Sequence, residues 1–347
     1  MTNSEPLAAI FGMSGFTLTD AERAFFKRVR PVGYILFARN IENPAQVSAL
    51  TQELRCLHTQ DEPLILIDQE GGKVQRMVPP HWRHAPAMAE FGELYARNPE
   101  LALETLKTNM TLIGRDLCNV GIDVDCAPVL DVPVPGAHDV IGNRAFSADP
   151  AVISAMAPAA CDGLRNAGVI PVIKHIPGHG RAKADSHKEL PVVDASLEYL
   201  RKSDFAPFSA LCDRADQAVC FGMTAHVVYT SIDPQLPATT SKTVIFEIIR
   251  GEIGFKGLLM SDDLGMKALS GPYDERAAAC LEAGCDVVLH CDGNMEDMEA
   301  VARGAGAIGA NVKKALADAA PIRLKPRVVF EEPLAADFMV MDALRRG

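Results

Sequence analysis

The sequence predicts a (β/α)8 TIM barrel that forms a single domain over residues 1–347. Three observations support this fold class: eight short apolar runs rich in Val, Ile and Leu, helix-like segments between them, and a length of 347 residues. Runs that are continuously apolar, without alternation, are typical of strands covered on both faces, as in parallel sheets. Eight such strands alternating with helices in a chain of this length favour a closed barrel.

Each apolar run is followed by polar or glycine-rich residues, which predicts a strand that opens into a loop. The runs are, in order, residues 6–15, 32–40, 63–72, 122–132, 168–180, 217–226, 256–266 and 284–293. An open doubly wound sheet is the alternative. The turn after the first run reads GMSGF, which lacks the glycine spacing of a dinucleotide-binding fold.

Four segments between the runs have the spacing of amphipathic helices. Residues 43–59 and 98–121 both open with Asn-Pro, a helix start signal, and the second ends on Gly121, a suitable C-cap. Residues 149–168 and 274–284 also end in glycine. After about residue 295 we expect a helix and then a tail, PIRLKPRVVFEEP, whose structure the pattern does not predict. No linker or break in composition divides the chain.

The composition narrows the choice of partners and compartment. A net charge of −11 argues against binding to nucleic acid or to an anionic membrane, since both need clustered Lys and Arg. We find neither a basic, apolar leader nor an apolar run of about 18 residues, so neither a signal peptide nor a membrane span is expected. The nine cysteines are scattered singly, without a CxxC pair. This pattern favours reduced thiols in the cytoplasm.

Charged residues terminate most of the predicted strands. In a barrel, the residues just past the carboxyl ends of the strands converge on one face and build the site. Because buried charge is costly unless it is paired, this ring is either a polar pocket or a set of internal salt bridges, and we favour the pocket. Its members are Asp68, Glu70, Asp125, Asp131, Lys174, His175, His226, Asp262 and Asp263.

The loop after the fifth run, IKHIPGHGRAKADSH at residues 173–187, permits three interpretations. The first is a metal site of His179, His187 and His226 with Asp185 or Asp262. The second is a phosphate cradle at the GHG sequence. Neither is favoured, since the chain has no HExxH motif and no helix signal follows the glycines. The third interpretation is proton transfer.

Proton transfer is suggested by Asp185 and His187, whose side chains would project from the same side of an extended loop. A carboxylate beside an imidazole orients the ring, and such a histidine can donate a proton to a leaving group and later take one from water. The partner is expected at SDD, where one aspartate of a strand end points inward. We expect Asp262 to point into the pocket, where its carboxylate could form a covalent ester with an electrophilic carbon.

Five sequence blocks together carry a resemblance to a known family. They are DQEGGKVQR (68–76), CAPVLDV (126–132), GNRAF (142–146), KHIPGHGRAKADSH (174–187) and SDDLGM (261–266). In this order they resemble family 3 glycoside hydrolases, and most of all the single-domain bacterial β-N-acetylglucosaminidases of peptidoglycan recycling. The long Lys-His…Asp-Ser-His block is the most specific of the five.

The resemblance implies a cytoplasmic, retaining, exo-acting hydrolase on a TIM barrel, with no metal and no cofactor. Its expected substrate is a peptidoglycan fragment of the N-acetylglucosaminyl-anhydromuropeptide type, from which it removes terminal β-linked N-acetylglucosamine. Asp262 falls on the nucleophile, His187 on the general acid/base and Asp185 on its dyad partner. The positions that bind the terminal sugar are Asp68, Arg76, Arg144, Lys174 and His175. We expect a monomer and no second α/β domain after the barrel.

Some alternatives stay open. Ile176 stands where the family often has Phe, and Gly265 where Ser is common, but neither falls on a proposed role. A metal-dependent hydrolase and a non-enzymatic sugar-binding protein are the competing functions. Phosphate could also compete with water, because an imidazole that has given up its proton repels an anion less than a carboxylate does. The preference for the N-acetyl group rests on the resemblance alone.

Overall fold

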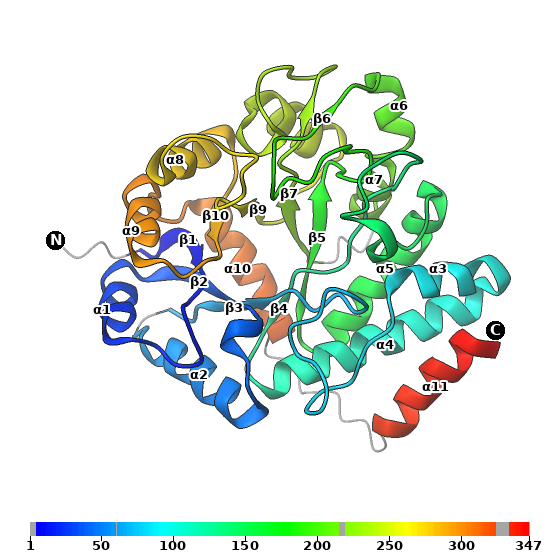
Figure 1. Ribbon diagram of the computed structural model, residues 1–347, viewed down its shortest axis with the longest axis horizontal. Coiled ribbons are helices and arrows are strands. Elements are labelled where there is room, and N and C mark those ends of the chain that lie inside the picture. Colours follow the sequence, from blue (N-terminus) through cyan, green and yellow to red (C-terminus); the bar gives the residue numbers. More distant parts are fainter. Residues whose placement is uncertain (1–4, 60, 215–218, 324–332, 347) are drawn as a thin grey trace.

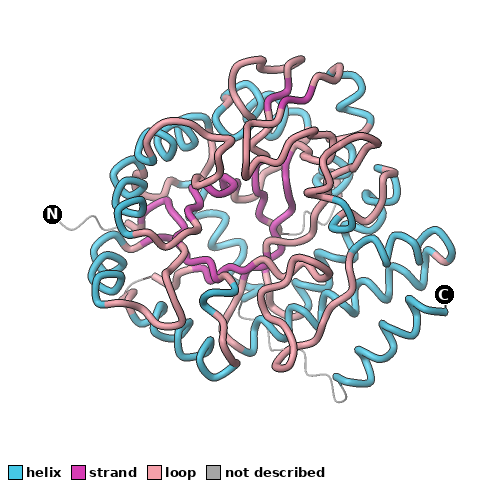
Figure 2. Tube along the Cα trace, in the orientation of Figure 1, coloured by secondary structure: helices cyan, strands magenta, loops and turns pink. Residues whose placement is uncertain are grey.

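The computed structural model describes residues 5–59, 61–214, 219–323 and 333–346 of the chain. Eight parallel strands close into a barrel in the order β1-β10-β9-β7-β5-β4-β3-β2, and Figure 2 shows this ring of strands with the helices outside it. The barrel strands are β1 (Leu7–Phe11), β2 (Pro31–Leu36), β3 (Leu64–Ile67), β4 (Val124–Asp125), β5 (Ile170–Ile176), β7 (Phe221–Thr224), β9 (Leu259–Asp263) and β10 (Val287–His290).

Each predicted apolar run coincides with one barrel strand, although β2 begins one residue before its run, and the predicted TIM-barrel fold class is confirmed. The fourth run contributes only a two-residue strand, and the residues after it stay joined to β5 by an isolated parallel bridge between Val129 and Lys174. Two further short strands, β6 (Val192–Val193) and β8 (Val228–Tyr229), pair outside the barrel. Residues 217 and 218 of the sixth run and 324–332 of the tail lie outside the described residues.

The helices surround the barrel, as Figure 1 shows. The α-helices are α1 (Asp20–Val29), α2 (Pro44–Cys56), α3 (Met88–Arg97), α4 (Pro99–Asn119), α5 (Pro150–Asn166), α6 (Leu197–Lys202), α7 (Ala206–Cys212), α8 (Tyr273–Ala283), α9 (Met295–Gly304), α10 (Ala310–Arg323) and α11 (Pro333–Arg346). The described part of the chain also contains three 3₁₀-helices, η1 (Ala38–Asn40), η2 (Gly142–Arg144) and η3 (Ala238–Thr240), and a π-helix, η4 (Val244–Glu252).

The four predicted helices are present, with the predicted start and stop signals in place. The side chains of Asn43 and Asn98 cap α2 and α4, each with proline in the first turn. Gly121 follows α4 with φ +83°, and Gly284 caps α8 with φ +116°, so both positions use the left-handed conformation that glycine tolerates.

The amino-terminal end of the barrel is closed by α10. Side chains of the barrel interior, such as Ile10, Leu66 and Met260, form one buried cluster with Val312 and Ala319 of this helix. The segment that leads into α10 is tied to the start of β1, because the Ile308 amide donates to the Pro6 carbonyl. A functional cavity therefore has to open at the other end, where the strands end in charged residues. Among the described helices, none has the length and apolar character needed to span a membrane.

Candidate active site

A cavity of about 400 Å³ opens at the carboxyl ends of the barrel strands. Seven of the eight predicted site residues line it, and the eighth, Asp185, is hydrogen-bonded to one of them, His187. Its lining residues are Ile35, Phe37, Asp68, Lys73, Val74, Arg76, Val140, Ile141, Arg144, Lys174, His175, His179, Ser186, His187, Met223, Asp262, Asp263, Met266, Leu289 and Cys291. The chain thus brings all eight predicted residues to one place.

A buried network of charges forms one wall of the cavity. Lys174, on β5, donates to Asp68 Oδ1 at 2.8 Å, and Nζ lies 2.7 Å from Glu70 Oε1. Arg144 binds the same glutamate with two parallel hydrogen bonds of 2.8 and 2.7 Å. Arg76 reaches Asp68 Oδ2 at 3.2 Å. Such bidentate, charge-assisted contacts fix the positions of the groups as well as stabilising them.

The charges of this network hold one another in their ionised forms. Burial acts to raise the pKa of Asp68, but Lys174 and Arg76 outweigh it and the pKa lies below its usual range. Burial likewise acts to lower the pKa of Lys174, and the neighbouring carboxylates raise it above its ordinary value. The wall therefore presents fixed charges to the cavity.

Two glycines make the turn that returns the chain to this wall. Gly71 and Gly72 follow Glu70 with φ values of +99° and +58°. A Cβ on Gly71 would lie 2.4 Å from the Pro86 carbonyl oxygen, so side chains are excluded by space as well as by backbone conformation. This tight turn lets Arg76 come back beside Asp68, where its guanidinium also packs 5.2 Å from the Phe37 ring centroid.

Asp131 anchors the loop that carries the histidines. Its Oδ2 accepts a 2.6 Å hydrogen bond from His175 Nδ1, and its Oδ1 accepts the backbone amides of His175 and His179 at 3.2 and 2.6 Å. Burial acts to raise the pKa of Asp131, but the two histidines lower it to about 2. Gly180 packs directly on the preceding loop, since a Cβ there would lie 2.2 Å from the Val132 carbonyl oxygen.

Asp185 and His187 form a hydrogen-bonded pair at the rim of the cavity. His187 Nδ1 lies 2.8 Å from Asp185 Oδ1, which also accepts the His187 backbone amide at 3.0 Å. The predicted contact is present, but the predicted extended loop is wrong. Residues 186–188 form a turn, closed by the Lys188 amide on the Asp185 carbonyl, and the turn brings the two side chains together. Ser186, between them, points inward and is buried.

Asp262 lies at the end of β9, buried in the cavity wall. Burial acts to raise its pKa, but the imidazoles of His175 and His226 and the Asp263 amide lower it below the ordinary value. Asp263 also borders the cavity, so the predicted inward and outward alternation is incomplete here. Its Oδ1 is turned back to the backbone, where it accepts the amides of Gly265 and Cys291.

Within the described residues, the histidines of the metal interpretation do not place their ring nitrogens close enough together to share an ion. His226 has both ring nitrogens engaged, with Thr239 Oγ1 at 2.7 Å and the Asp263 carbonyl at 3.1 Å. His179 Nε2 lies 3.3 Å from Ser186. Among the described residues, one group of three potential ligands has its donor atoms within 4.8 Å of one another, and it contains none of these histidines.

Two residues that position the site were not predicted to have a site role. Glu70 and Asp131 were recognised only as members of the ring of strand-end charges. Each is fully paired within the protein, Glu70 by Arg144 and Lys174 and Asp131 by the histidine loop. Apolar residues of the cavity, such as Ile141, Met223 and Met266, carried no sequence signal that separates them from the core.

Comparisons with known proteins agree with this geometry. The sequence pattern described as glycosyl hydrolase family 3 N terminal domain matches residues 11–320. A protein named beta-hexosaminidase from Bordetella avium is 40% identical over 290 residues, which are 83% of this chain and 81% of that one. Another of that name, from Chromobacterium violaceum, is 42% identical over 282 residues, 81% of this chain and 77% of that one.

Solved structures extend the similarity to the whole barrel. The crystal structure of NagZ from Neisseria gonorrhoeae with N-trifluoroacetyl-D-glucosamine has a TM-score of 0.87 and 30% identity, covering 98% of each chain. A beta-N-acetylhexosaminidase from Beutenbergia cavernae has a TM-score of 0.75 and 27% identity, covering 98% of this chain and 94% of that one. Fold, sequence pattern and relatives agree, and the chain belongs to glycosyl hydrolase family 3.

Proposed function

We propose that this protein is a retaining exo-β-N-acetylglucosaminidase that works through a covalent glycosyl-aspartate on Asp262, with His187 as general acid/base. The observation that carries the proposal is that Asp262 and His187 line the same cavity, together with a set of fixed charges suited to sugar hydroxyls. A cavity of about 400 Å³ lies within the range usual for small-molecule sites.

In the first step, a carboxylate oxygen of Asp262 forms a bond to the anomeric carbon while the bond to the leaving oxygen breaks. His187 gives its proton to that oxygen, so that the aglycone leaves as a neutral alcohol. The depressed pKa of Asp262 keeps the carboxylate ionised and ready to attack. Asp185 holds Nδ1 of the imidazole, which leaves Nε2 as the nitrogen that faces the substrate.

In the second step, a water molecule attacks the anomeric carbon and Asp262 leaves as a carboxylate. His187 takes the proton from the water and returns to its starting form, so the pair of steps regenerates the enzyme. Two displacements at one carbon retain its configuration. Burial acts to raise the pKa of Asp185, but its hydrogen bonds to His187 lower it, so Asp185 remains a negative partner for the imidazole throughout.

The charged wall would hold the terminal sugar. Asp68 keeps lone pairs beyond those engaged by Lys174 and Arg76, and these can accept from two neighbouring hydroxyls. Lys174, Arg76 and His175 line the cavity as donors, and Arg144 is held beside them by Glu70. Groups fixed in this way orient the sugar ring for attack at its anomeric carbon.

The choice of N-acetylglucosamine rests on the relatives. Proteins named beta-hexosaminidase and a NagZ structure that holds an N-acylated glucosamine are similar to this chain over most of its length. We therefore propose a terminal β-linked N-acetylglucosamine on a cell-wall fragment of the anhydromuropeptide type, hydrolysed in the cytoplasm by a monomeric enzyme.

Replacing the nucleophile gives the sharpest test. Asp262→Ala should abolish release of nitrophenol from the aryl β-N-acetylglucosaminide, while circular dichroism shows an intact fold. Added azide should then restore turnover and yield the α-glycosyl azide, because azide takes the place of the missing carboxylate in a single displacement. The His187→Ala variant with azide should yield the β-azide instead, since azide then opens the covalent intermediate.

Controls separate a wrong role from a damaged protein. His81→Ala removes an exposed histidine that does not line the cavity and should leave turnover unchanged. Near-wild-type turnover by Asp262→Ala would end the assignment. A turnover panel of aryl glucoside and N-acetylglucosaminide tests the sugar preference, and the same panel with chelator tests the metal-dependent alternative. Formation of a sugar 1-phosphate in phosphate buffer would reveal phosphorolysis.

A further inference from the structure

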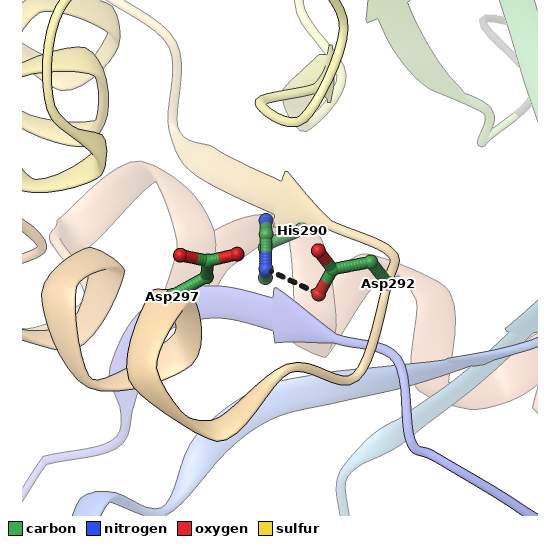
Figure 3. A group of neighbouring side chains, drawn as sticks. All are labelled: His290, Asp292 and Asp297. Atoms are coloured by element: carbon green, nitrogen blue, oxygen red, sulfur yellow. Dashed lines mark ion pairs between the residues drawn. The ribbon is translucent and has the colours of Figure 1, made fainter.

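Three side chains that the proposed mechanism does not use meet beside the cavity. His290 ends β10, Asp292 lies in the loop that follows, and Asp297 lies in the first turn of α9 (Figure 3). Each offers one potential metal ligand atom, and these atoms all lie within 4.8 Å of one another. Three neighbouring elements thus point nitrogen and oxygen donors at a common space.

His290 lacks a satisfactory hydrogen bond in this cluster. The residue is 0% exposed, and within the described part of the chain neither ring nitrogen has a hydrogen-bond partner. Nε2 lies 2.9 Å from Asp292 Oδ1, an ion pair when the ring is protonated and the dashed line in Figure 3, but the contact does not have hydrogen-bond geometry. Nδ1 is 4.0 Å from Asp263 Oδ1, which is too far. Figure 3 shows the ring edge-on between the two carboxylates.

A buried polar group without a hydrogen-bond partner is destabilising, so an imidazole without hydrogen bonds between two acids indicates a missing ligand. The Tyr273 ring packs edge-to-face on the His290 ring at 5.0 Å and helps to fix its position. The two carboxylates also repel each other, and a protonated imidazole between them balances only one of their two negative charges. A dication would satisfy the ring nitrogen and balance both acids.

We propose that His290, Asp292 and Asp297 bind a divalent cation of the zinc class. One imidazole nitrogen and two carboxylate oxygens are ligand types that Zn²⁺ takes at about 2.0–2.2 Å, with water in the remaining position. The harder ions Mg²⁺ and Ca²⁺ prefer sites made of oxygen alone. The ligand atoms need only a small inward movement of the two aspartates, which lie in a loop and at a helix start.

The cation site is separate from the catalytic cavity. None of its three residues lines that cavity, although their neighbours Leu289 and Cys291 do. A bound ion would fasten the end of β10 to the start of α9 without touching the sugar. The inference does not depend on the proposed function, because zinc binding can be measured whether or not the protein hydrolyses a glycoside.

The test measures Zn²⁺ binding directly. Metal-free protein is titrated with zinc chloride in a calorimeter, and crystals grown with zinc are measured at the zinc absorption edge to locate the ion. We expect one saturable equivalent and an anomalous peak between the three side chains. Affinity should fall at least tenfold in Asp292→Asn, Asp297→Asn and His290→Gln. Zinc should also raise the melting temperature of the wild type more than that of these variants.

Glu296→Gln is the matched control, since it removes one negative charge from the same turn of α9 without removing a proposed ligand. Its affinity should stay within twofold of the wild type. Because Asp292 is exposed, we expect Asp292→Asn to fold, so its zinc affinity tests the proposal even if His290→Gln fails to fold. Absence of saturable binding, equal affinity in Asp292→Asn, or an anomalous peak located elsewhere, for instance at His187, would overturn the proposal.

Discussion

Two parts of the cavity are built in opposite ways: the buried network of charges, called the buried wall, and the Asp185–His187 pair at the rim, called the exposed wall. On one side, Glu70 and Lys174 have side chains that are 2% and 3% exposed and are paired within the buried network. On the other, His187 is 61% exposed and is held by a single carboxylate, Asp185. The comparison separates two tasks. The buried wall keeps its charges fixed, whereas in the proposed mechanism the exposed pair exchanges protons with a substrate and with water.

This difference predicts how each wall contributes to stability and to turnover. Removing one partner of a buried ion pair leaves an uncompensated charge and costs about 3–5 kcal/mol, whereas exposed pairs contribute about 0–1 kcal/mol. Substitutions in the buried wall should therefore show in the free energy of unfolding. Substitutions in the exposed pair should show in turnover.

The largest loss of stability is expected from Lys174→Met. This change leaves Asp68 and Glu70 buried beside each other without their shared ammonium group, so the free energy of unfolding should drop by about 3–5 kcal/mol. Urea denaturation followed by circular dichroism measures it. Lys73→Met, at the exposed rim of the same cavity, is the control and should cost less than about 1 kcal/mol. Equal losses in the two variants would contradict the contrast between the walls.

The next effect concerns Asp131 and appears as a dependence on pH. Its pKa is about 2 in the folded protein, against about 3.9 in an unfolded chain, so it contributes roughly 2–3 kcal/mol of stability. That contribution is complete above about pH 5 and is lost as the pH falls through 4 and then 2, because the unfolded chain binds the proton first. Denaturation at a series of pH values between 6 and 2 gives the free energy of unfolding, which should change less with pH for Asp131→Asn than for the wild type. The same dependence on pH in both proteins would show that the charge of Asp131 does not stabilise the histidine loop.

A smaller cost is expected where the loop of the exposed pair packs on its neighbour. Gly180→Ala places a Cβ against the Val132 carbonyl oxygen, which forces a backbone shift and should cost about 1–3 kcal/mol. Gly15→Ala is the control, because a Cβ there meets no atom within 4 Å. Turnover of Gly180→Ala should fall as well, since the same loop carries His187. A neutral Gly180→Ala would mean that the loop can move away at no cost.

How far the sequence predicts this molecule follows from the range of each interaction. Strands and helices were predictable because continuous apolar runs, Asn-Pro starts and terminal glycines act within a few residues, and the carboxyl-end rule then gathered the site residues. The pairings within the site were not. Lys174 meets Asp68 across 106 positions and Arg144 meets Glu70 across 74, so no local pattern specifies which charge pairs with which.

The turn that brings Asp185 and His187 into contact could not be predicted from the local sequence either. A separation of two residues suits both an extended strand and a turn, and the turn is chosen by hydrogen bonds that the sequence does not display. The glycines of this loop were predicted to give conformational freedom. At Gly180 glycine is instead required because the backbone of Val132, in another loop, leaves no room for a Cβ. Close packing of distant segments is a tertiary property, and only the folded chain reveals it.

The smallest change in stability is expected from Asp185→Asn, and it tests the exposed wall most directly. The pair lies at the rim, so the free energy of unfolding should change by less than about 1 kcal/mol. Turnover should nevertheless fall at least tenfold, within the total of about 10²–10⁴-fold that a general acid/base contributes, because the imidazole loses the carboxylate that orients it. The loss should be greater for a substrate with a poor leaving group than for the nitrophenyl glycoside, which needs little help from an acid. Lys188→Met removes the other charge near Asp185, 3.9 Å away, and should leave both quantities unchanged. If Asp185→Asn instead unfolds as readily as Lys174→Met while its remaining folded fraction turns over normally, the division of tasks between the two walls is wrong.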